Sequence, residues 1–369
     1  MTANKTPSQI RRLSGRYQKY YSSFSKSSLS LLRYFRVKGR RKFTDTQAHS
    51  EQWLLLGFGQ QQQTYLDDLR ALKLTRNAVF LLDTEQATSA AYRHHKIDQL
   101  SALESWLTQP WTGILVSSHL RLSTAHYQLL EAARSQGTPV LETSEFYENR
   151  LHKLPADTLP KSGITLSTGF QLLTSQLGQR IKRFGDVLLA ALILLLVAPI
   201  MLLTAVFIKL DSPGPVFYSQ TRTGRNLQAF KVHKFRSMVQ DAEKHGAQWA
   251  KTKDARITRV GQFIRLVRID ELPQLWNVLK GDMSMIGPRP ERPEFDQQLV
   301  AEIPHYSARY AIKPGITGWA QVLYPYGASV EDAYQKLAYD LYYIKNYSPW
   351  LDIVIVLKTV GVVLLGKGR

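Results

Sequence analysis

An apolar stretch from residue 187 to residue 208 dominates the sequence, and only Thr204 and Pro199 interrupt its 22 residues. A helix of this length reaches across a hydrocarbon core of about 30 Å. Pro199 lies near the middle, where proline removes a backbone hydrogen bond and clashes with the preceding turn. We therefore expect a membrane-associated helix with a kink or a break at Pro199.

The charges that flank this stretch bear on how it meets the membrane. Lys182 and Arg183 precede it, and Lys209 and Arg222 follow it. Basic residues favour the cytoplasmic side, so both flanks are expected there. A helix that breaks at Pro199 and returns to the same leaflet fits this charge pattern better than a single span. A single-span helix and a buried core helix are the alternatives.

Net charge points to an anionic partner. The chain has 48 Lys and Arg against 29 Asp and Glu, a formal net charge of +19. Residues 1–48 contribute 12 of the basic residues and one acid, Asp45, with Tyr and Phe interspersed. Such an arm suits an anionic membrane surface or a nucleic acid, and a solvated tail is the plainer alternative. No signal-peptide pattern follows, so we expect the N-terminus in the cytosol.

The sequence contains no cysteine. Disulfides, thiolate zinc sites, iron–sulfur clusters and cysteine nucleophiles are therefore excluded. Any covalent chemistry must use another nucleophile.

Residues 49–145 alternate short apolar runs with helical stretches, which indicates a small α/β unit with a largely parallel sheet. Gly57 and Gly59 follow the first run, but Gln62 replaces the third glycine of a dinucleotide-binding motif, so a purely structural turn is favoured. The runs are Trp53–Leu56, Tyr65–Leu72, Val79–Leu82, Leu100–Leu107, Gly113–Val116, Tyr127–Ala133 and Val140–Leu141.

We expect four segments: a basic arm (1–48), the α/β domain (49–145), a linker with an entry helix (146–180) and a membrane-associated domain (181–369). Residues 209–349 contain no second apolar stretch of membrane length. Asp352 and Lys358 interrupt the apolar residues after Trp350, which favours an interfacial or packed helix there.

Asp270 and Glu271 are the candidate chemical groups. Arg265, Arg268 and Arg289 lie nearby in the sequence. A carboxylate can act as a nucleophile in phosphoryl transfer while guanidinium groups neutralise phosphate charge. Mg²⁺ suits hard oxygen ligands. The alternative for an isolated acidic pair is a helix start with surface ion pairs.

Three further patterns add cationic and aromatic groups. Pro288 and Pro290 stiffen a turn around Arg289. Lys234 and Arg236 alternate around Phe235, so both would share one strand face. The segment from Lys313 to Trp319 offers glycine amides and a ring that could stack on a base. Together these patterns describe a cationic site for a nucleoside diphosphate beside a membrane.

Several motifs between residues 182 and 369 resemble those of the bacterial sugar transferases, the monotopic phosphoglycosyl transferases that start exopolysaccharide, capsule and O-antigen synthesis. The matching stretches are KRFGD, DSPGPVFYSQTRTG, KFRSM, RIDELPQLWNVLKGDMSMIGPRPERPEF, KPGITGWAQV and YDLYYIKNYS. The resemblance implies an α+β, mainly helical, membrane-associated catalytic domain whose apolar helix is re-entrant with its break at Pro199. The α/β unit resembles, in shortened form, the Rossmann-like domain of larger members.

The resemblance also implies a mechanism. Asp270 would attack the β-phosphate of a UDP-sugar and release UMP, and undecaprenyl phosphate would then accept the phosphosugar. Asp270 and Glu271 would hold Mg²⁺, with Mn²⁺ as a substitute. The expected phosphate-binding and substrate-binding residues are Arg265, Arg289, Lys234, Arg236, Arg222, Pro288, Pro290, Thr317, Trp319 and Gln321.

Partners and location follow from the same resemblance. We expect the cytoplasmic face of the bacterial inner membrane, a homodimer as in many members, and no nucleic acid as a partner. The family's serine before the central proline is Ala198 here. Larger members begin with a four-helix membrane bundle, and we expect the basic arm to bind anionic lipid in its place. The competing hypotheses are a membrane-tethered nucleic-acid-binding protein and a catalytically inactive scaffold.

Overall fold

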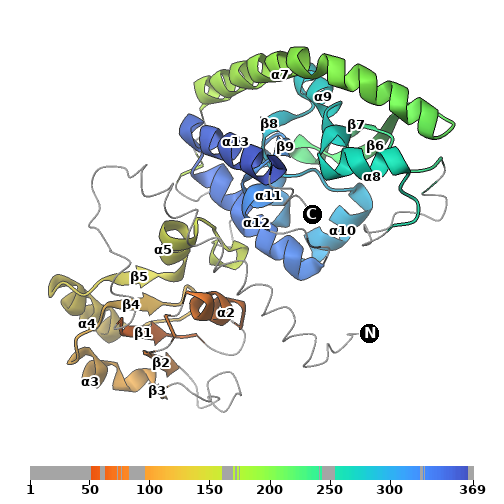
Figure 1. Cartoon of the computed structure of the whole chain (residues 1–369). Helices are drawn as coiled ribbons and strands as arrows, with labels where there is room; N and C mark the ends of the chain where they lie inside the picture. Colours follow the sequence, from red (N-terminus) through yellow and green to blue (C-terminus); the bar gives the residue numbers. More distant parts are fainter. Residues whose placement is uncertain are drawn as a thin grey trace. The chain divides into compact units, whose positions relative to one another are not determined.

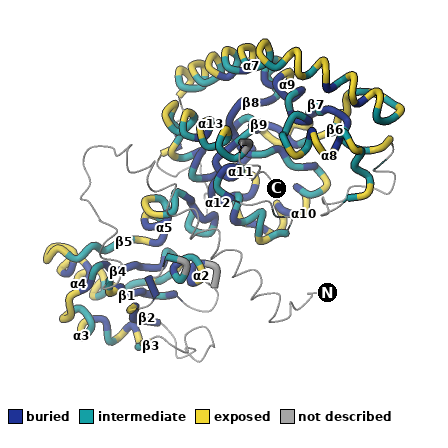
Figure 2. The backbone as a smooth tube through the Cα atoms, in the orientation of Figure 1, coloured by how far each residue is buried: buried dark blue, intermediate teal, exposed yellow. Residues whose placement is uncertain are grey.

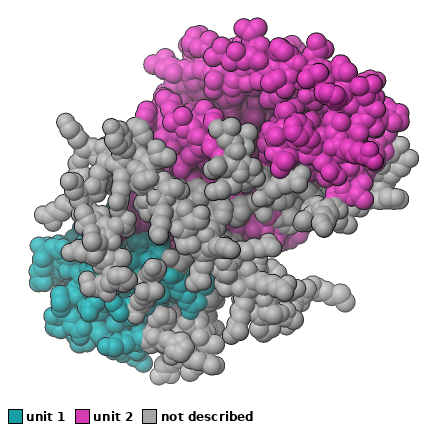
Figure 3. Space-filling view, viewed as in Figure 1, with its two compact units in different colours: residues 1–146 teal, residues 147–369 magenta. Residues whose placement is uncertain are grey.

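The computed structural model divides the chain into two compact units, Met1–Phe146 and Tyr147–Arg369 (Figures 1 and 3). The basic arm lies outside the residues that the structure describes. Those residues are 51–58, 63–72, 74–75, 77–82, 96–159, 169–170, 173, 175–240, 242, 254–324, 327 and 329–364.

The first unit is built on a five-stranded parallel sheet with the strand order β3-β2-β1-β4-β5. Strands β1, β2 and β4 are fully buried apolar runs, as expected where helices cover both faces of a parallel sheet. This confirms the predicted α/β unit. The strands are β1 (Trp53–Leu56), β2 (Ala78–Leu82), β3 (Lys96–Gln99), β4 (Gly113–Val116) and β5 (Val140–Glu142).

Helices connect these strands and complete the core. Helix α4 begins with a capping box in which Ser123 and His126 exchange hydrogen bonds. Gly57 after β1 has a φ of 75°, and Leu120 lies 2.8 Å from the position of a Cβ there, so this turn requires glycine. The helical elements are α2 (Gln63–Ala71), η4 (Leu100–Ala102), α3 (Leu103–Leu107), α4 (Thr124–Ser135) and α5 (Thr143–Phe146).

The second unit is mainly helical, with an antiparallel pair β6-β7 and a short parallel pair β8-β9. Its elements are η5 (Tyr147–Leu151), η6 (Ala156–Thr158), α7 (Gln176–Asp211), β6 (Phe217–Thr223), η7 (Arg225–Leu227), β7 (Ala229–Phe235), α8 (Arg259–Leu266), η8 (Ile269–Glu271), α9 (Gln274–Lys280), β8 (Ser284–Ile286), α10 (Pro293–Glu302), η9 (Tyr306–Ala311), β9 (Gly315–Thr317), α11 (Trp319–Leu323), α12 (Val330–Lys345) and α13 (Pro349–Leu364).

Helix α7 contains the long apolar stretch. It runs for 36 residues and continues through Pro199, where a kink or a break was expected, and Figure 1 shows the helix as an arch. Within the described residues it is long and apolar enough to cross a membrane, and 11% of its most apolar window is buried. Figure 2 shows exposed and intermediate residues along most of its length. Leucines such as Leu195 and Leu202 are more than two-thirds exposed, at 74% and 71%.

The first part of the expected linker belongs to the second unit. Tyr147, Leu154 and Ala156 are buried there. The Leu154 amide donates a hydrogen bond to the Ala338 carbonyl on α12 over 2.7 Å. The second compact unit therefore includes residues from Tyr147 onward together with α7 and the segments that follow it.

Candidate active site

Asp270 and Glu271 lie on a tight turn between two helices. Arg268 adopts a left-handed conformation with a φ of 63° after α8, and this reversal leads into the single turn η8. Pro273 then precedes the first turn of α9, where a missing amide costs nothing. The side chains of both acids are largely buried, since Asp270 is 9% exposed and Glu271 is 8% exposed.

Glu271 is held by basic side chains. Its Oε1 accepts a hydrogen bond from Lys234 Nζ over 3.1 Å and one from Arg289 Nη2 over 2.7 Å. Arg268 Nη1 lies 3.8 Å from the same oxygen. Burial alone would raise the pKa of Glu271, but the charges of Arg289, Lys234 and Arg268 hold that pKa well below its usual range. Glu271 is therefore a carboxylate that anchors cations.

Asp270 differs from its neighbour. Its Oδ1 is buried and has no hydrogen-bond partner among the described residues. Burial raises the pKa of Asp270, and the charge of Glu271 raises it further. An unpartnered carboxylate oxygen beside a cationic cluster is a candidate nucleophile toward a phosphate.

The β6-β7 pair supplies Lys234, and α9 holds this pair in place. Asn277 on α9 is fully buried. Its Oδ1 accepts from the His233 amide over 3.1 Å, and its Nδ2 donates to the Lys231 carbonyl over 2.7 Å. Asn277 was not among the predicted site residues, and its only signal in the sequence is a polar residue within the otherwise apolar run LWNVL.

Arg289 is presented by the proline-rich turn after β8. The Gly287 amide donates to the Thr317 carbonyl over 2.9 Å, and the Pro288 carbonyl accepts from the Gly315 amide over 2.9 Å. Arg309, also missed in the sequence, donates from Nη2 to the Arg289 carbonyl over 2.9 Å. The turn is thus fixed on both sides of the arginine.

Three more of the predicted residues adjoin this turn or Asp270. Arg289 Nη1 donates to Gln321 Oε1 over 3.3 Å. Arg222 Nη1 donates to the Pro290 carbonyl over 3.2 Å. The charge of Arg265, in the last turn of α8, lowers the pKa of Asp270 and so acts against the burial effect.

Arg236 lies apart from the carboxylates. It follows the last residue of β7 and donates hydrogen bonds to the carbonyls of Ile208, Ser212 and Pro213 over 3.3, 2.6 and 2.8 Å. It therefore supplies hydrogen-bond donors to backbone carbonyls at the C-terminal end of α7. The described hydrogen bonds of Arg236 are to the end of α7, whereas Lys234 binds Glu271, so these contacts do not bring Arg236 together with Lys234.

Thr317 and Trp319 serve other contacts. The Thr317 hydroxyl is hydrogen-bonded to the Thr359 hydroxyl on α13 over 2.8 Å. Trp319 is 2% exposed. Its Nε1 donates to the His152 carbonyl over 2.8 Å, and its ring stacks on Tyr342 with centroids 6.1 Å apart. Trp319 is therefore a packing residue with no face open for a base.

Asp270 and Glu271 differ in how well they suit a divalent cation. Within the described parts of the chain, no three His, Asp or Glu side chains gather into a metal site. Mg²⁺ is commonly held by one or two carboxylates together with substrate phosphates. The unpartnered Oδ1 of Asp270 fits this arrangement, whereas Oε1 of Glu271 is already occupied by cations.

Comparisons with known proteins identify the second unit. A protein of Aeromonas hydrophila named "UDP-N-acetylgalactosamine-undecaprenyl-phosphate N-acetylgalactosaminephosphotransferase" is 53% identical over 197 residues, which make up 53% of this chain and 47% of that protein. The chain thus spans about half the length of this relative.

Two other relatives are covered more fully. A "UDP-glucose:undecaprenyl-phosphate glucose-1-phosphate transferase" of Caulobacter vibrioides is 44% identical over 214 residues, 57% of this chain and 80% of that protein. An "Exopolysaccharide production protein PSS" of Rhizobium leguminosarum is 43% identical over 195 residues, 51% of this chain and 98% of that protein. The model of the family described as "Bacterial sugar transferase" matches residues 177–366, so the chain belongs to this family.

Proposed function

We propose that the chain transfers a sugar 1-phosphate from a UDP-sugar to undecaprenyl phosphate and releases UMP. The names of the Aeromonas and Caulobacter relatives contain this acceptor and a UDP-sugar donor. The observation that carries the proposal is the contrast between the adjacent acids, because Glu271 binds cations while Asp270 keeps an unpartnered oxygen.

In the first step, a carboxylate oxygen of Asp270 attacks the β-phosphorus of the UDP-sugar. A bond forms between this oxygen and phosphorus, and the bond from the β-phosphorus to the bridging oxygen breaks. UMP leaves with the bridging oxygen, and the phosphosugar stays on Asp270. In the second step, an oxygen of undecaprenyl phosphate attacks the same phosphorus, which restores the carboxylate and gives an undecaprenyl diphosphate sugar.

Lys234 and Arg289 stand ready to neutralise the diphosphate. Both cations contact Glu271 and are held beside Asp270 before any substrate binds. Preorganised charges of this kind stabilise a transition state without a reorganisation cost. A divalent cation held by Asp270 and the substrate phosphates would supply further stabilisation of the negative charge on the diphosphate.

The exposed apolar surface of α7 supports attachment to the membrane that contains the lipid acceptor. We place the active site on the cytoplasmic face of the inner membrane, where the basic flanks of α7 would lie. The arched course through Pro199 is compatible with a helix that returns to the leaflet it entered.

The test uses membranes that contain the full chain and a UDP-sugar labelled with ³²P at the β-phosphate. Without acceptor, label should accumulate on the wild-type protein as UMP is released, and peptide mapping should locate it at Asp270. Asp270→Asn should abolish the labelling. Glu294→Gln removes an exposed carboxylate on α10 and is the matched control. Chelation of divalent cations should stop UMP release.

Equal labelling of wild type and Asp270→Asn would reject Asp270 as the nucleophile. Salt-dependent retention of nucleic acid without UMP release would favour the nucleic-acid-binding hypothesis. A chain that neither releases UMP nor retains nucleic acid would fit the scaffold hypothesis.

A further inference from the structure

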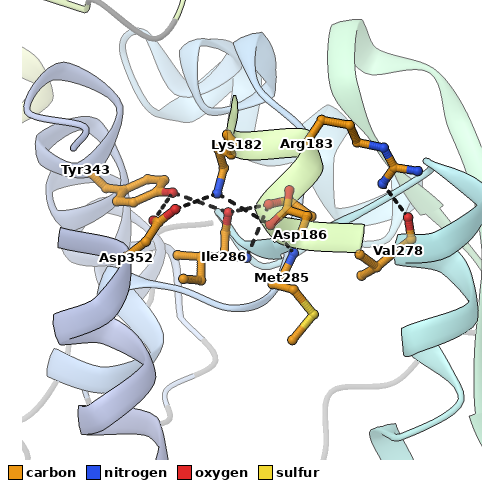
Figure 4. A network of polar contacts seen from close by, with 9 residues as sticks. Lys182, Arg183, Asp186, Val278, Met285, Ile286, Tyr343 and Asp352 are labelled. Carbon is orange, nitrogen blue, oxygen red and sulfur yellow. Dashed lines mark hydrogen bonds and ion pairs between the residues drawn. The ribbon is translucent and has the colours of Figure 1, made fainter. Parts of the chain in front are cut away.

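The start of α7 carries a buried polar network, shown in Figure 4. Lys182 Nζ lies 2.9 Å from Asp352 Oδ2 on α13 and 3.7 Å from Asp186 Oδ1, one turn along α7. Lys182 and Asp186 have side chains that are only 9% and 8% exposed. Tyr343 on α12 donates from its hydroxyl to Asp352 Oδ1 over 2.7 Å.

The network closes around one peptide segment of β8. Asp186 Oδ1 accepts from the Met285 amide over 3.1 Å. The Tyr343 hydroxyl lies 3.3 Å from the carbonyl of the next residue, Ile286. Lys182 joins the two sides because it contacts both Asp186 and Asp352. Asp186 of α7 therefore binds an amide of β8, Tyr343 of α12 lies against the next carbonyl, and Lys182 links the two sides through Asp352.

Strand β8 leads directly into the turn that presents Arg289. Ile286 is followed by Gly287, whose Cβ position would lie 2.4 Å from the Lys313 carbonyl, so the turn has no room to move toward β9. Only Gly287 and Pro288 lie between Ile286 and Arg289. A shift of β8 would therefore be passed to the guanidinium that binds Glu271.

Burying these charges carries a desolvation cost that an apolar contact would avoid. Buried charged residues of this kind can serve to orient other functional groups. We propose that Asp186 and Lys182 are positioning residues, which hold β8 so that Arg289 meets Glu271 and the substrate diphosphate. The kinetic test of this inference rests on the proposed transferase function. The structural test is independent of that function.

The structural test is amide hydrogen exchange on the full chain in nanodiscs. Asp186→Ala should speed exchange at residues 285–289 and leave the β6-β7 pair unchanged. Asp186→Asn keeps an acceptor for the Met285 amide and should restore slow exchange. Arg180→Met removes an exposed charge from the same end of α7 and is the control. Tyr343→Phe is a milder second variant that should loosen the same segment if Asp186→Ala does not fold.

The kinetic test is a double-mutant cycle. Asp186→Ala should lower kcat for UMP release about tenfold or more, because displacement of a catalytic group by about 1 Å can cost as much as 100-fold. Asp186→Asn should stay within about threefold of wild type. In an Arg289→Gln background, Asp186→Ala should have little further effect, since both changes would act through one group.

Three results would overturn the inference. They are unchanged exchange at 285–289, equal acceleration of exchange in β6-β7, or additive effects of Asp186→Ala and Arg289→Gln. If wild type released no UMP, the proposed function would fail, and the exchange experiment would still decide whether the network holds β8.

Discussion

Arg289 donates a hydrogen bond from Nη2 to Oε1 of Glu271 over 2.7 Å, and this contact joins the proline-rich turn to the acidic turn η8. Lys234 binds the same oxygen. Glu271 therefore gathers two cations and leaves its neighbour Asp270 without a hydrogen bond on Oδ1. In the proposed mechanism the two acids have separate roles because their surroundings differ, although they are adjacent in the chain.

Replacing Arg289 tests the importance of this contact. Arg289→Gln should lower kcat/KM for UMP release by about 100-fold to 1,000-fold, because one preorganised donor to developing charge is lost. Arg289→Lys should lower kcat/KM by a smaller factor, because it keeps the positive charge. It should still fall below wild type, because a lysine cannot reach both Glu271 and Gln321. Arg225→Gln removes an exposed charge and should match wild type. Wild-type kinetics for Arg289→Gln would remove this residue from the proposed mechanism.

The fold of the first unit could be predicted where the pattern is local. Apolar runs such as Trp53–Leu56 and Gly113–Val116 became buried strands because a covered parallel sheet requires continuous apolar sequence. Strand β3 was missed because its sequence KIDQ is polar and it lies at the edge of the sheet. The helix continues through Pro199 although proline removes one backbone hydrogen bond and clashes with the preceding turn.

The site could be predicted in part. Asp270, Glu271 and Arg289 are close in sequence, and their residue types indicate phosphate chemistry. The partners of Asn277 and Arg309 include backbone groups, which leave no trace in side-chain patterns. Trp319 was expected to offer its ring to a base, but contacts with distant residues bury it.

Arg236 should prove important for stability and not for substrate binding. It is 6% exposed and donates to three carbonyls near the end of α7. Arg236→Met keeps much of the apolar volume but removes these three hydrogen bonds, which should cost about 3 kcal/mol. Thermal unfolding in detergent should show a lower Tm, while KM for the UDP-sugar should be unchanged.

The control for this prediction is Lys231→Met, which removes an exposed charge from the same strand. It should change neither Tm nor KM. A raised KM with an unchanged Tm for Arg236→Met would instead make Arg236 a substrate-binding residue.

Trp319→Phe distinguishes packing from base stacking. The substitution keeps the ring against Tyr342 but removes the hydrogen bond to the His152 carbonyl. We expect a loss of about 1 kcal/mol in the free energy of unfolding and no change in KM for different UDP-sugars. A tenfold increase in KM at unchanged stability would show that the ring contacts the nucleotide.

Asp340 on α12 should make stability depend on pH. It is 2% exposed, and its Oδ2 lies 3.0 Å from Arg309 Nη2. Burial raises the pKa of Asp340 from 3.8 to about 6, although the charge of Arg309 opposes this rise. Between these two values the folded chain keeps a proton that the unfolded chain has released. The free energy of unfolding should therefore fall by about 3 kcal/mol as the pH rises through this window.

The side chain in Asp340→Asn cannot release a proton, so comparison with this variant isolates the contribution of Asp340 to the pH dependence of stability. The free energy of unfolding of wild type minus that of Asp340→Asn should fall by about 3 kcal/mol from pH 4 to pH 7. Thermal unfolding of both proteins in the same detergent at several pH values measures this difference. The exposed carboxylate variant Glu294→Gln should show no such trend. A difference that is constant, or that moves in favour of wild type with rising pH, would mean that Asp340 stays ionised beside Arg309, because the ion pair then outweighs the cost of burial.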